Sequence, residues 1–216
     1  PSVLVGDFLY SRAFQMLVEV GDIKIMEIIA NTTNTISEGE VQQLTNAHDP
    51  EINEATYKKV IFKKTAVLFD AAAEIGALIA ASTHQQQSAL SSYGRHVGMA
   101  FQLMDDVLDY NGNIEYLGKN IGDDLAEGKA TLPLIYAMKN GTQQQQHLIQ
   151  EAIKNASLDK LDSIFDAIRV TGALEYTMSC AREHAMEAKR CLADLPDTKE
   201  KKAMMELASF SIDRKY

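Results

Sequence analysis

The chain has 216 residues, of which 46% are hydrophobic, and a formal net charge of −9. This acidity argues against nucleic acid or an anionic membrane as the main partner, and the hydrophobic content argues against disorder. The two cysteines, Cys180 and Cys191, have neither the spacing of a zinc site nor the number for a disulfide framework. No signal peptide is visible, and no run approaches the roughly 18 apolar residues that span a bilayer. The composition therefore predicts a protein of the reducing cytoplasm with no transmembrane segment.

Helical periodicity recurs from end to end, and only four prolines interrupt it. The sequence thus predicts an all-α fold with a single helical domain over residues 1–216. The first predicted helix ends near Gly21, and Asp22 is placed to cap the next one. Asn53 is a plausible cap for a further helix, which the apolar spacing extends over residues 57–81.

Four lysines follow the start of that third helix: Lys58, Lys59, Lys63 and Lys64. Lysines on a helix are ordinarily solvated, and the sequence alone does not distinguish Lys64 from Lys63 as a ligand contact. Residues 84–92 form a polar stretch that indicates a connector, with Ser88 or Ser91 beginning the next helix.

Residues 101–110, FQLMDDVLDY, are the centre of that helix. At 100° per residue, an apolar stripe runs along Leu90, Tyr93, Val97, Phe101, Met104 and Leu108. Beside it, at i, i+3, i+4, i+7 spacing, lie four polar residues: Gln102, Asp105, Asp106 and Asp109. The rest of the circumference is apolar again (Ala100, Leu103 and Val107), which is typical of a buried helix, so we expect the carboxylates to face an internal cleft.

Burying three neighbouring carboxylates costs several kcal/mol unless protons or cations compensate them. An all-carboxylate set suits Mg²⁺, which is usually held by one or two carboxylates together with substrate phosphates and water. The alternative is an acidic, solvated helix face, which these apolar surroundings disfavour. The pattern predicts a magnesium platform.

A glycine-rich loop follows, with turn signals at Asn111-Gly112 and glycines at 118, 122 and 128. It carries Lys119, Asp123 and Lys129. Glycine lets backbone approach a ligand closely, lysine suits phosphate, and a carboxylate such as Asp123 can accept a hydrogen bond from metal-bound water. Directly after an acidic helix, this loop indicates a diphosphate-and-magnesium site.

The last third of the chain carries signals for helix starts and ends, and no chemical motif. Pro133 fits the first turn of a helix that stops at Asn140-Gly141. Two pairs match the capping-box pattern, Thr142 with Gln145 and Asp197 with Glu200. Ser157 is predicted to cap a helix that ends at Gly172.

FQLMDDVLDY followed by GKNIGDDLAEGKATLPL resembles the second aspartate-rich motif and following loop of the trans-isoprenyl diphosphate synthases. The sequence of these motifs is nearest to that of long-chain bacterial members such as the octaprenyl diphosphate synthases. The resemblance covers essentially the whole chain. It implies an isoprenoid-synthase-type helical bundle around a central cleft. It also implies that Met16, Leu17 and Met26 are candidates for a tunnel wall, although we favour ordinary packing, since a methionine stripe is more often part of a core.

The resemblance also implies roles for single residues. Lys64 and Thr65 match a lysine–threonine pair that contacts the allylic diphosphate, and Gln102 would orient diphosphate or metal-bound water. Lys119 and Lys129 would add fixed positive charge. Asp105 and Asp109 are the first choice as magnesium ligands, with Asp106 acting through water and Asp123 as a further member of the set.

The implied reaction is repeated head-to-tail condensation of an allylic diphosphate with isopentenyl diphosphate, giving a long trans-polyprenyl diphosphate of the kind used for quinone side chains. Family members are usually homodimers. Only one DDxxD occurs here, so the resemblance starts after the first aspartate-rich motif, and we expect a truncated chain that is inactive alone. Two alternatives stay open: a terpene-cyclising enzyme of similar architecture, and a non-catalytic helical subunit or dimerisation partner.

Overall fold

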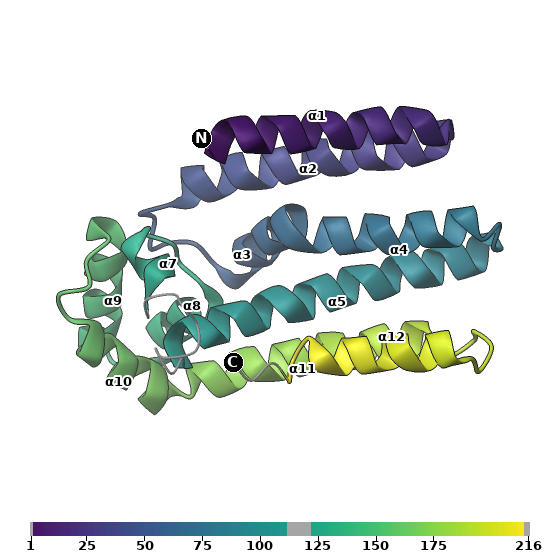
Figure 1. Cartoon of the computed structure of the whole chain (residues 1–216). Helices are drawn as coiled ribbons and strands as arrows, with labels where there is room; N and C mark the ends of the chain where they lie inside the picture. Colours follow the sequence, from purple (N-terminus) through teal and green to yellow (C-terminus); the bar gives the residue numbers. More distant parts are fainter. Residues whose placement is uncertain (1, 112–121, 214–216) are drawn as a thin grey trace.

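The computed structural model describes residues 2–111 and 122–213, and within them the chain forms helices and no strand, which confirms the all-α class (Figure 1). The helices are α1 (Ser2–Val20), α2 (Ile23–Asn46), α3 (Glu54–Ile61), the π-helical segment η1 (Phe62–Ala66), α4 (Val67–Ile79), α5 (His84–Asn111), α7 (Asp123–Ala126), α8 (Leu132–Asn140), α9 (Gln143–Asn155), α10 (Leu161–Thr171), α11 (Ala173–Cys191) and α12 (Lys199–Phe210). The long helices run side by side, and α7 to α10 gather at the end where α5 finishes (Figure 1). None of the described helices is both long enough and apolar enough to cross a membrane.

The first two helices meet at the expected turn. Gly21 takes a positive φ of 71°, and Asp22 Oδ1 accepts hydrogen bonds from the backbone N–H of Lys24 and Ile25 at 2.8 and 3.4 Å. This confirms the predicted cap. α1 lies along α2 and contributes no buried residue, so the interpretation of Met16, which is 55% exposed, as a packing residue is wrong (Figure 1).

The helix expected over residues 57–81 is interrupted by a π-helix. Asn53 caps α3 as predicted, since its Oδ1 accepts from Thr56 N at 3.0 Å. Within η1 the hydrogen bonds widen, and Val67 N–H donates to the carbonyl of Phe62, five residues earlier. π-Helical turns are rare and often lie at functional sites, and this one contains Lys64 and Thr65.

Glycines allow the backbones around η1 to touch. A Cβ on Gly39 of α2 would lie 2.8 Å from Lys64 N, and one on Gly98 of α5 would lie 2.6 Å from Ala66 Cα. A Cβ on Gly94 would come within 2.2 Å of the Phe69 carbonyl oxygen. The lysine–threonine segment is therefore packed between α2 and α5 with no room for a methyl group on either side.

α5 begins earlier than expected. Residues 84–92 are helical, so their interpretation as a connector, with a start at Ser88 or Ser91, is wrong. Thr83 and Gln86 supply the missing signal: Gln86 N–H donates to Thr83 Oγ1 at 3.3 Å, and Thr83 N–H donates to Gln86 Oε1 at 3.0 Å. This reciprocal arrangement is a capping box.

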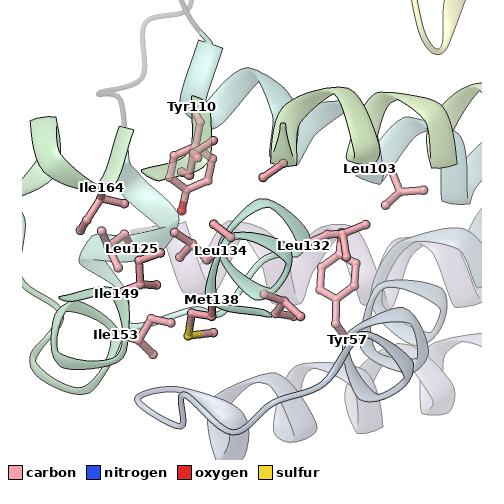
Figure 2. Packing of buried hydrophobic residues seen from close by; sticks show 14 of the residues in the cluster. Tyr57, Leu103, Tyr110, Leu125, Leu132, Leu134, Met138, Ile149, Ile153 and Ile164 are labelled. Atoms are coloured by element: carbon pink, nitrogen blue, oxygen red, sulfur yellow. The ribbon is translucent and has the colours of Figure 1, made fainter. Parts of the chain in front are cut away.

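The core side of α5 differs from the expected stripe. Leu103 and Val107 are fully buried, whereas Phe101, Met104 and Leu108 are only half-buried. Leu103 belongs to a cluster that also takes residues from α3, α7, α8, α9 and α10 (Figure 2). α5 packs against both α4 and α11, so it is buried on two sides, as the near-continuous apolar circumference predicted.

The helix starts and ends of the last third are mostly as predicted. Pro133 lies in the first turn of α8, which ends at Asn140, and Thr142 and Gln145 form the capping box of α9. Gly172, with a φ of 72°, ends α10.

Two predicted caps in this region are wrong. α10 begins after Lys160, and Ser157 Oγ instead accepts from Asp159 N–H within the preceding turn at 3.2 Å. α12 is capped by Thr198, whose hydroxyl accepts from Lys201 N–H. Asp197 lies one residue too early for that role and instead pairs with Lys201 Nζ at 3.0 Å.

Candidate active site

Asp106 lies at the centre of a hydrogen-bonded series near the end of α5. Its side chain is buried, at 2% exposure, and both carboxylate oxygens have a donor. Tyr57 Oη donates to Oδ2 at 2.5 Å, and Gln102 Nε2 donates to Oδ1 at 2.9 Å. Thr65 Oγ1 in turn donates to Gln102 Oε1 at 2.8 Å. The structure thus joins the predicted residues Thr65, Gln102 and Asp106.

The charge of Asp106 is balanced by neutral donors alone in this series. Burial raises the pKa of Asp106 to about 8, and the nearby charges of Asp124 and Asp105 act in the same direction. The hydrogen bonds from Tyr57 and Gln102 oppose this rise. A carboxyl in this position is held neutral more easily than charged unless a cation comes close.

Asp109, one turn further along α5, faces the start of α7. Its Oδ2 accepts from Asp124 N–H at 3.4 Å, and its carbonyl oxygen accepts from Gly122 N–H at 3.1 Å. Burial, followed by the charge of Asp124, raises the pKa of Asp109 to about 7. The charge of Asp123 adds to the same effect. Carboxylates from α5 and α7 therefore share one low-dielectric region.

This donor set fits a hard divalent cation. Within residues 2–111 and 122–213, no three His, Cys, Asp or Glu side chains are arranged to hold a metal ion by themselves. Mg²⁺ does not need such a cage, because one or two carboxylates with phosphate oxygens and water complete its shell. Asp105 and Asp109 are half-buried, and the like charges around Asp109 are the kind that a cation relieves.

Lys64 is fixed in η1 by the neighbouring helix α2. Its Nζ donates to Gln43 Oε1 at 2.7 Å and lies 3.4 Å from Glu40 Oε1. Lys63, the adjacent lysine, pairs instead with Glu38 at 3.0 Å. The structure therefore separates two lysines that the sequence could not.

Lys129 follows α7 and lies among carboxylates. Its Nζ is 3.0 Å from Asp124 Oδ1 and 2.7 Å from Glu127 Oε2. Burial lowers the pKa of Lys129, but the pairs with Glu127 and Asp124 more than offset this and hold it above the usual value. The predicted Lys119 lies outside the described residues.

Two residues of this region were missed by the sequence analysis. Asp124 is adjacent to the predicted Asp123 and touches both Asp109 and Lys129. The position of Asp124 next to Asp123 in the sequence GDD was the signal that could have identified it. Tyr57 carried no signal, because a tyrosine on an apolar helix face is indistinguishable from an ordinary core residue.

His96 pairs with another histidine away from these carboxylates. His96 Nδ1 and His184 Nδ1 lie 2.9 Å apart between α5 and α11. Burial, with the charges of His96 and Lys58, lowers the pKa of His184 to about 4, while Glu187 opposes this. A surface pocket of about 630 Å³, beside Glu54, Lys139 and Tyr176, contains none of the predicted site residues.

The aspartate-rich helix end lies within an all-α bundle, and solved structures identify this bundle as an isoprenoid synthase fold. A polyprenyl synthase from Caulobacter crescentus, crystallised with calcium and isoprenyl diphosphate, superposes with a TM-score of 0.94 at 43% identity. The match covers 100% of this chain and 66% of that one. A decaprenyl diphosphate synthase from Rhodobacter capsulatus gives a TM-score of 0.91 at 38% identity, over 99% of this chain and 66% of its own.

The family follows from the sequence comparison. The model of the family described as Polyprenyl synthetase matches residues 1–168, and the chain belongs to this family. The octaprenyl diphosphate synthase of Haemophilus influenzae is 49% identical over all of this chain and 66% of its own length. That of Escherichia coli is 47% identical over 99% of this chain and 66% of its own. The chain thus spans about two thirds of the length of these relatives.

Proposed function

We propose that this chain carries the diphosphate-binding centre of a Mg²⁺-dependent prenyltransferase. The reaction condenses an allylic diphosphate with isopentenyl diphosphate and repeats to give a long trans-polyprenyl diphosphate. The family membership and the relatives named octaprenyl diphosphate synthases support a long product, of the kind used for quinone side chains. They favour this function over the terpene-cyclising alternative.

One observation carries the proposal: the Lys64–Thr65 segment is hydrogen-bonded to the aspartate-rich helix through Gln102. A cationic side chain and a set of carboxylates that need a cation are thereby held in one site. Bound Mg²⁺ would supply Lewis-acid stabilisation of the diphosphate leaving group. Asp105 and Asp109 would hold it, with Asp106 and Asp123 acting indirectly.

The chain's own residues then orient and stabilise the substrate. Lys64, held by Gln43, places positive charge where charge develops on the departing diphosphate. Lys129, and Lys119 outside the described residues, would add to this field. The amide N–H of Gln102 can donate to diphosphate oxygens, and Thr65 holds Gln102 in that orientation. Ionisation breaks the allylic C–O bond and releases diphosphate. The alkene of isopentenyl diphosphate then forms a C–C bond to the allylic cation, and the resulting cation gives up a proton to a base, for which the released diphosphate is available.

Calorimetric titration of the chain with inorganic diphosphate, with and without Mg²⁺, tests this centre. We expect binding that depends on Mg²⁺ and is lost in Asp109→Ala. Binding that is absent in both titrations, or identical in both, would contradict the proposal. For elongation, we expect the 216-residue chain alone to incorporate no labelled isopentenyl diphosphate onto an allylic primer. Sustained formation of long products would contradict that expectation.

We further propose that the protein is a homodimer in the cytoplasm. α1 buries no residue and exposes apolar side chains, Leu4, Phe8 and Leu9 among them, and a large apolar patch typically marks an interface. The same surface favours the second candidate function, a non-catalytic dimerisation partner. A sedimentation measurement determines whether the chain is a monomer or a dimer. A diphosphate-binding measurement then distinguishes the prenyltransferase from the non-catalytic dimerisation partner. A dimer that binds no diphosphate would favour the second.

A further inference from the structure

Four side chains connect α3 and η1 to α5 in a single hydrogen-bonded series. Tyr57 and Thr65 stand on one side, and Gln102 and Asp106 stand one turn apart on the other. Tyr57 is 5% exposed and Asp106 is 2% exposed, so water does not compete for the bond between them. The two ends of the series, Tyr57 and Thr65, are therefore coupled through buried polar groups.

The π-helix aligns these two ends. At 100° per residue, eight residues of α-helix would place Tyr57 and Thr65 about 80° apart around the axis. The wider turn of η1 rotates by less than this at each residue and so reduces the separation. Both side chains consequently reach the same face of α5.

The direction of each hydrogen bond follows from the donor and acceptor atoms that meet. Gln102 Nε2 donates to Asp106 Oδ1, so the NH₂ group of Gln102 faces the carboxyl group. The carbonyl oxygen of Gln102 then faces Thr65, whose hydroxyl donates to it. The hydroxyl proton of Thr65 is thereby used within the series, and the second N–H of Gln102 is left for an acceptor such as a diphosphate oxygen.

We propose that Tyr57 is a positioning residue for the diphosphate site: its hydroxyl holds Asp106, which together with Thr65 fixes the orientation of the Gln102 amide. The inference rests on the proposed function, because it gives the second N–H of Gln102 a diphosphate oxygen to contact. Without the Tyr57 hydroxyl, one oxygen of Asp106 loses its donor and the carboxylate is free to rotate toward a cation at Asp105 and Asp109. Gln102 then loses its fixed partner, and its N–H loses its orientation toward the diphosphate.

Tyr57→Phe tests this role with little change of packing, because the ring stays in the core cluster. Tyr93→Phe is the matched control: Tyr93 is also buried, and its hydroxyl donates to the Met204 carbonyl at 2.9 Å, on another part of α5. Both variants are titrated with inorganic diphosphate in the presence of Mg²⁺, and the melting temperature of each is measured. We expect Tyr57→Phe to bind about 5- to 10-fold more weakly, the effect of losing an oriented hydrogen bond, and Tyr93→Phe to bind as the wild type does.

A double-mutant cycle with Thr65→Val separates positioning from loss of stability. If Tyr57 acts through Gln102, which Thr65 also holds, the two affinity losses are less than additive, and Tyr57→Phe has its full effect in Thr65→Ser, which keeps the hydroxyl. Additive losses, or a Tyr57→Phe affinity equal to that of Tyr93→Phe, would overturn the inference and leave the proposed function standing. A wild-type chain that binds no diphosphate with Mg²⁺ would overturn both.

Asp106→Asn provides a second variant if Tyr57→Phe does not fold. The asparagine keeps the shape of Asp106 and can still accept from Tyr57, but its amide then faces the NH₂ group of Gln102. Gln102 must turn over, and Thr65 loses its acceptor. We expect an affinity loss similar to that of Tyr57→Phe, and unchanged affinity would overturn the inference.

Discussion

Two regions of the α4–α5 pair bury carboxylates, and they compensate the charge in different ways. Asp70 on α4 accepts from Ser91 Oγ at 2.5 Å and from both Nε and Nη2 of Arg95, at 3.1 and 2.9 Å. Arg95 also lies 5.2 Å from the centre of the Phe62 ring. The chain itself therefore supplies a positive charge to this carboxylate.

At the other end of α5, the donors to Asp106 among the described residues are neutral, and Asp109 has further carboxylates around it. Lys129, a described lysine of the same region, is shared between Asp124 and Glu127. A buried charge compensated within the chain is a structural feature, whereas one left to an external cation indicates binding. The two regions can be separated by experiment.

The largest effect is expected at the second region. Asp105→Ala or Asp109→Ala should lower turnover at least 100-fold in a form of the enzyme that elongates prenyl chains, because each removes electrostatic stabilisation of the leaving group. The measurement is incorporation of labelled isopentenyl diphosphate. Asp70→Asn is the control and should keep its turnover per folded molecule. Equal losses in all three variants would remove the distinction between the regions.

Asp70→Asn should instead reduce the free energy of unfolding by about 2 kcal/mol. Breaking a buried ion pair costs about 3–5 kcal/mol, and half-exposed Arg95 regains part of this from water. Urea unfolding followed by circular dichroism gives the value. A loss below about 0.5 kcal/mol would mean that Asp70 is as weakly compensated as the carboxylates at the other end.

Lys64→Ala and Lys129→Ala should each weaken Mg²⁺-dependent diphosphate binding by about tenfold, the effect of losing one charge-assisted contact. Lys63→Ala is the matched control, since Lys63 is the adjacent residue and pairs with Glu38. Calorimetry on the three variants tests which lysine belongs to the site. A larger loss in Lys63→Ala than in Lys64→Ala would reverse the assignment.

Asp109→Asn should make the metal-free protein more stable above pH 7, by about 1 kcal/mol after allowance for solvent screening. The pKa of Asp109 is raised from 3.8 to about 7 on folding. The stability linked to this group is thus complete below pH 3.8 and is lost as the pH rises through 7. Melting curves from pH 5 to 9 should fall for the wild type and fall less for Asp109→Asn, and added Mg²⁺ should offset the wild-type loss. A wild-type melting temperature that rises over this range would contradict the prediction.

The smallest effect concerns the histidine pair, which lies between the two regions. The pKa of His184 is lowered from 6.5 to about 4, so its contribution to stability is present above pH 6.5 and is lost as the pH falls through 4. The charged groups that act on the pair are His96, Lys58, Glu187 and, through His96, Arg95. His184→Asn should reduce the fall in melting temperature between pH 6.5 and 4 by about 1–2 °C. An unchanged acid profile would show that the pair does not titrate in this range.

The sequence predicted those parts of the fold that depend on local signals. Asp22, Asn53 and Thr142 cap helices as expected, because a capping side chain acts within three residues of its own position. The spacing of Asp105, Asp106 and Asp109 also predicted a shared site, since α-helical geometry alone puts them on one side.

The remaining features depend on contacts between distant residues. Tyr57 and Asp106 are 49 positions apart, and nothing near either indicates the other. The π-helix packs closely against Gly39 and Gly98, which lie on other helices. The prediction of Asp197 as a cap is wrong because Thr198 caps the same helix. The capping pattern suits both residues and does not indicate which of them acts as the cap.

The glycines beside η1 have a consequence for motion. Gly39 and Gly98 leave the backbone of Lys64 and Ala66 in direct contact with α2 and α5, so this segment cannot open locally unless the two helices separate. Local opening that requires sub-global unfolding carries a high free energy, so amide hydrogen exchange there should be slow. The backbone of Lys64, the lysine proposed to face the diphosphate, is thus ordered without a ligand, and binding need not include the entropy of ordering it.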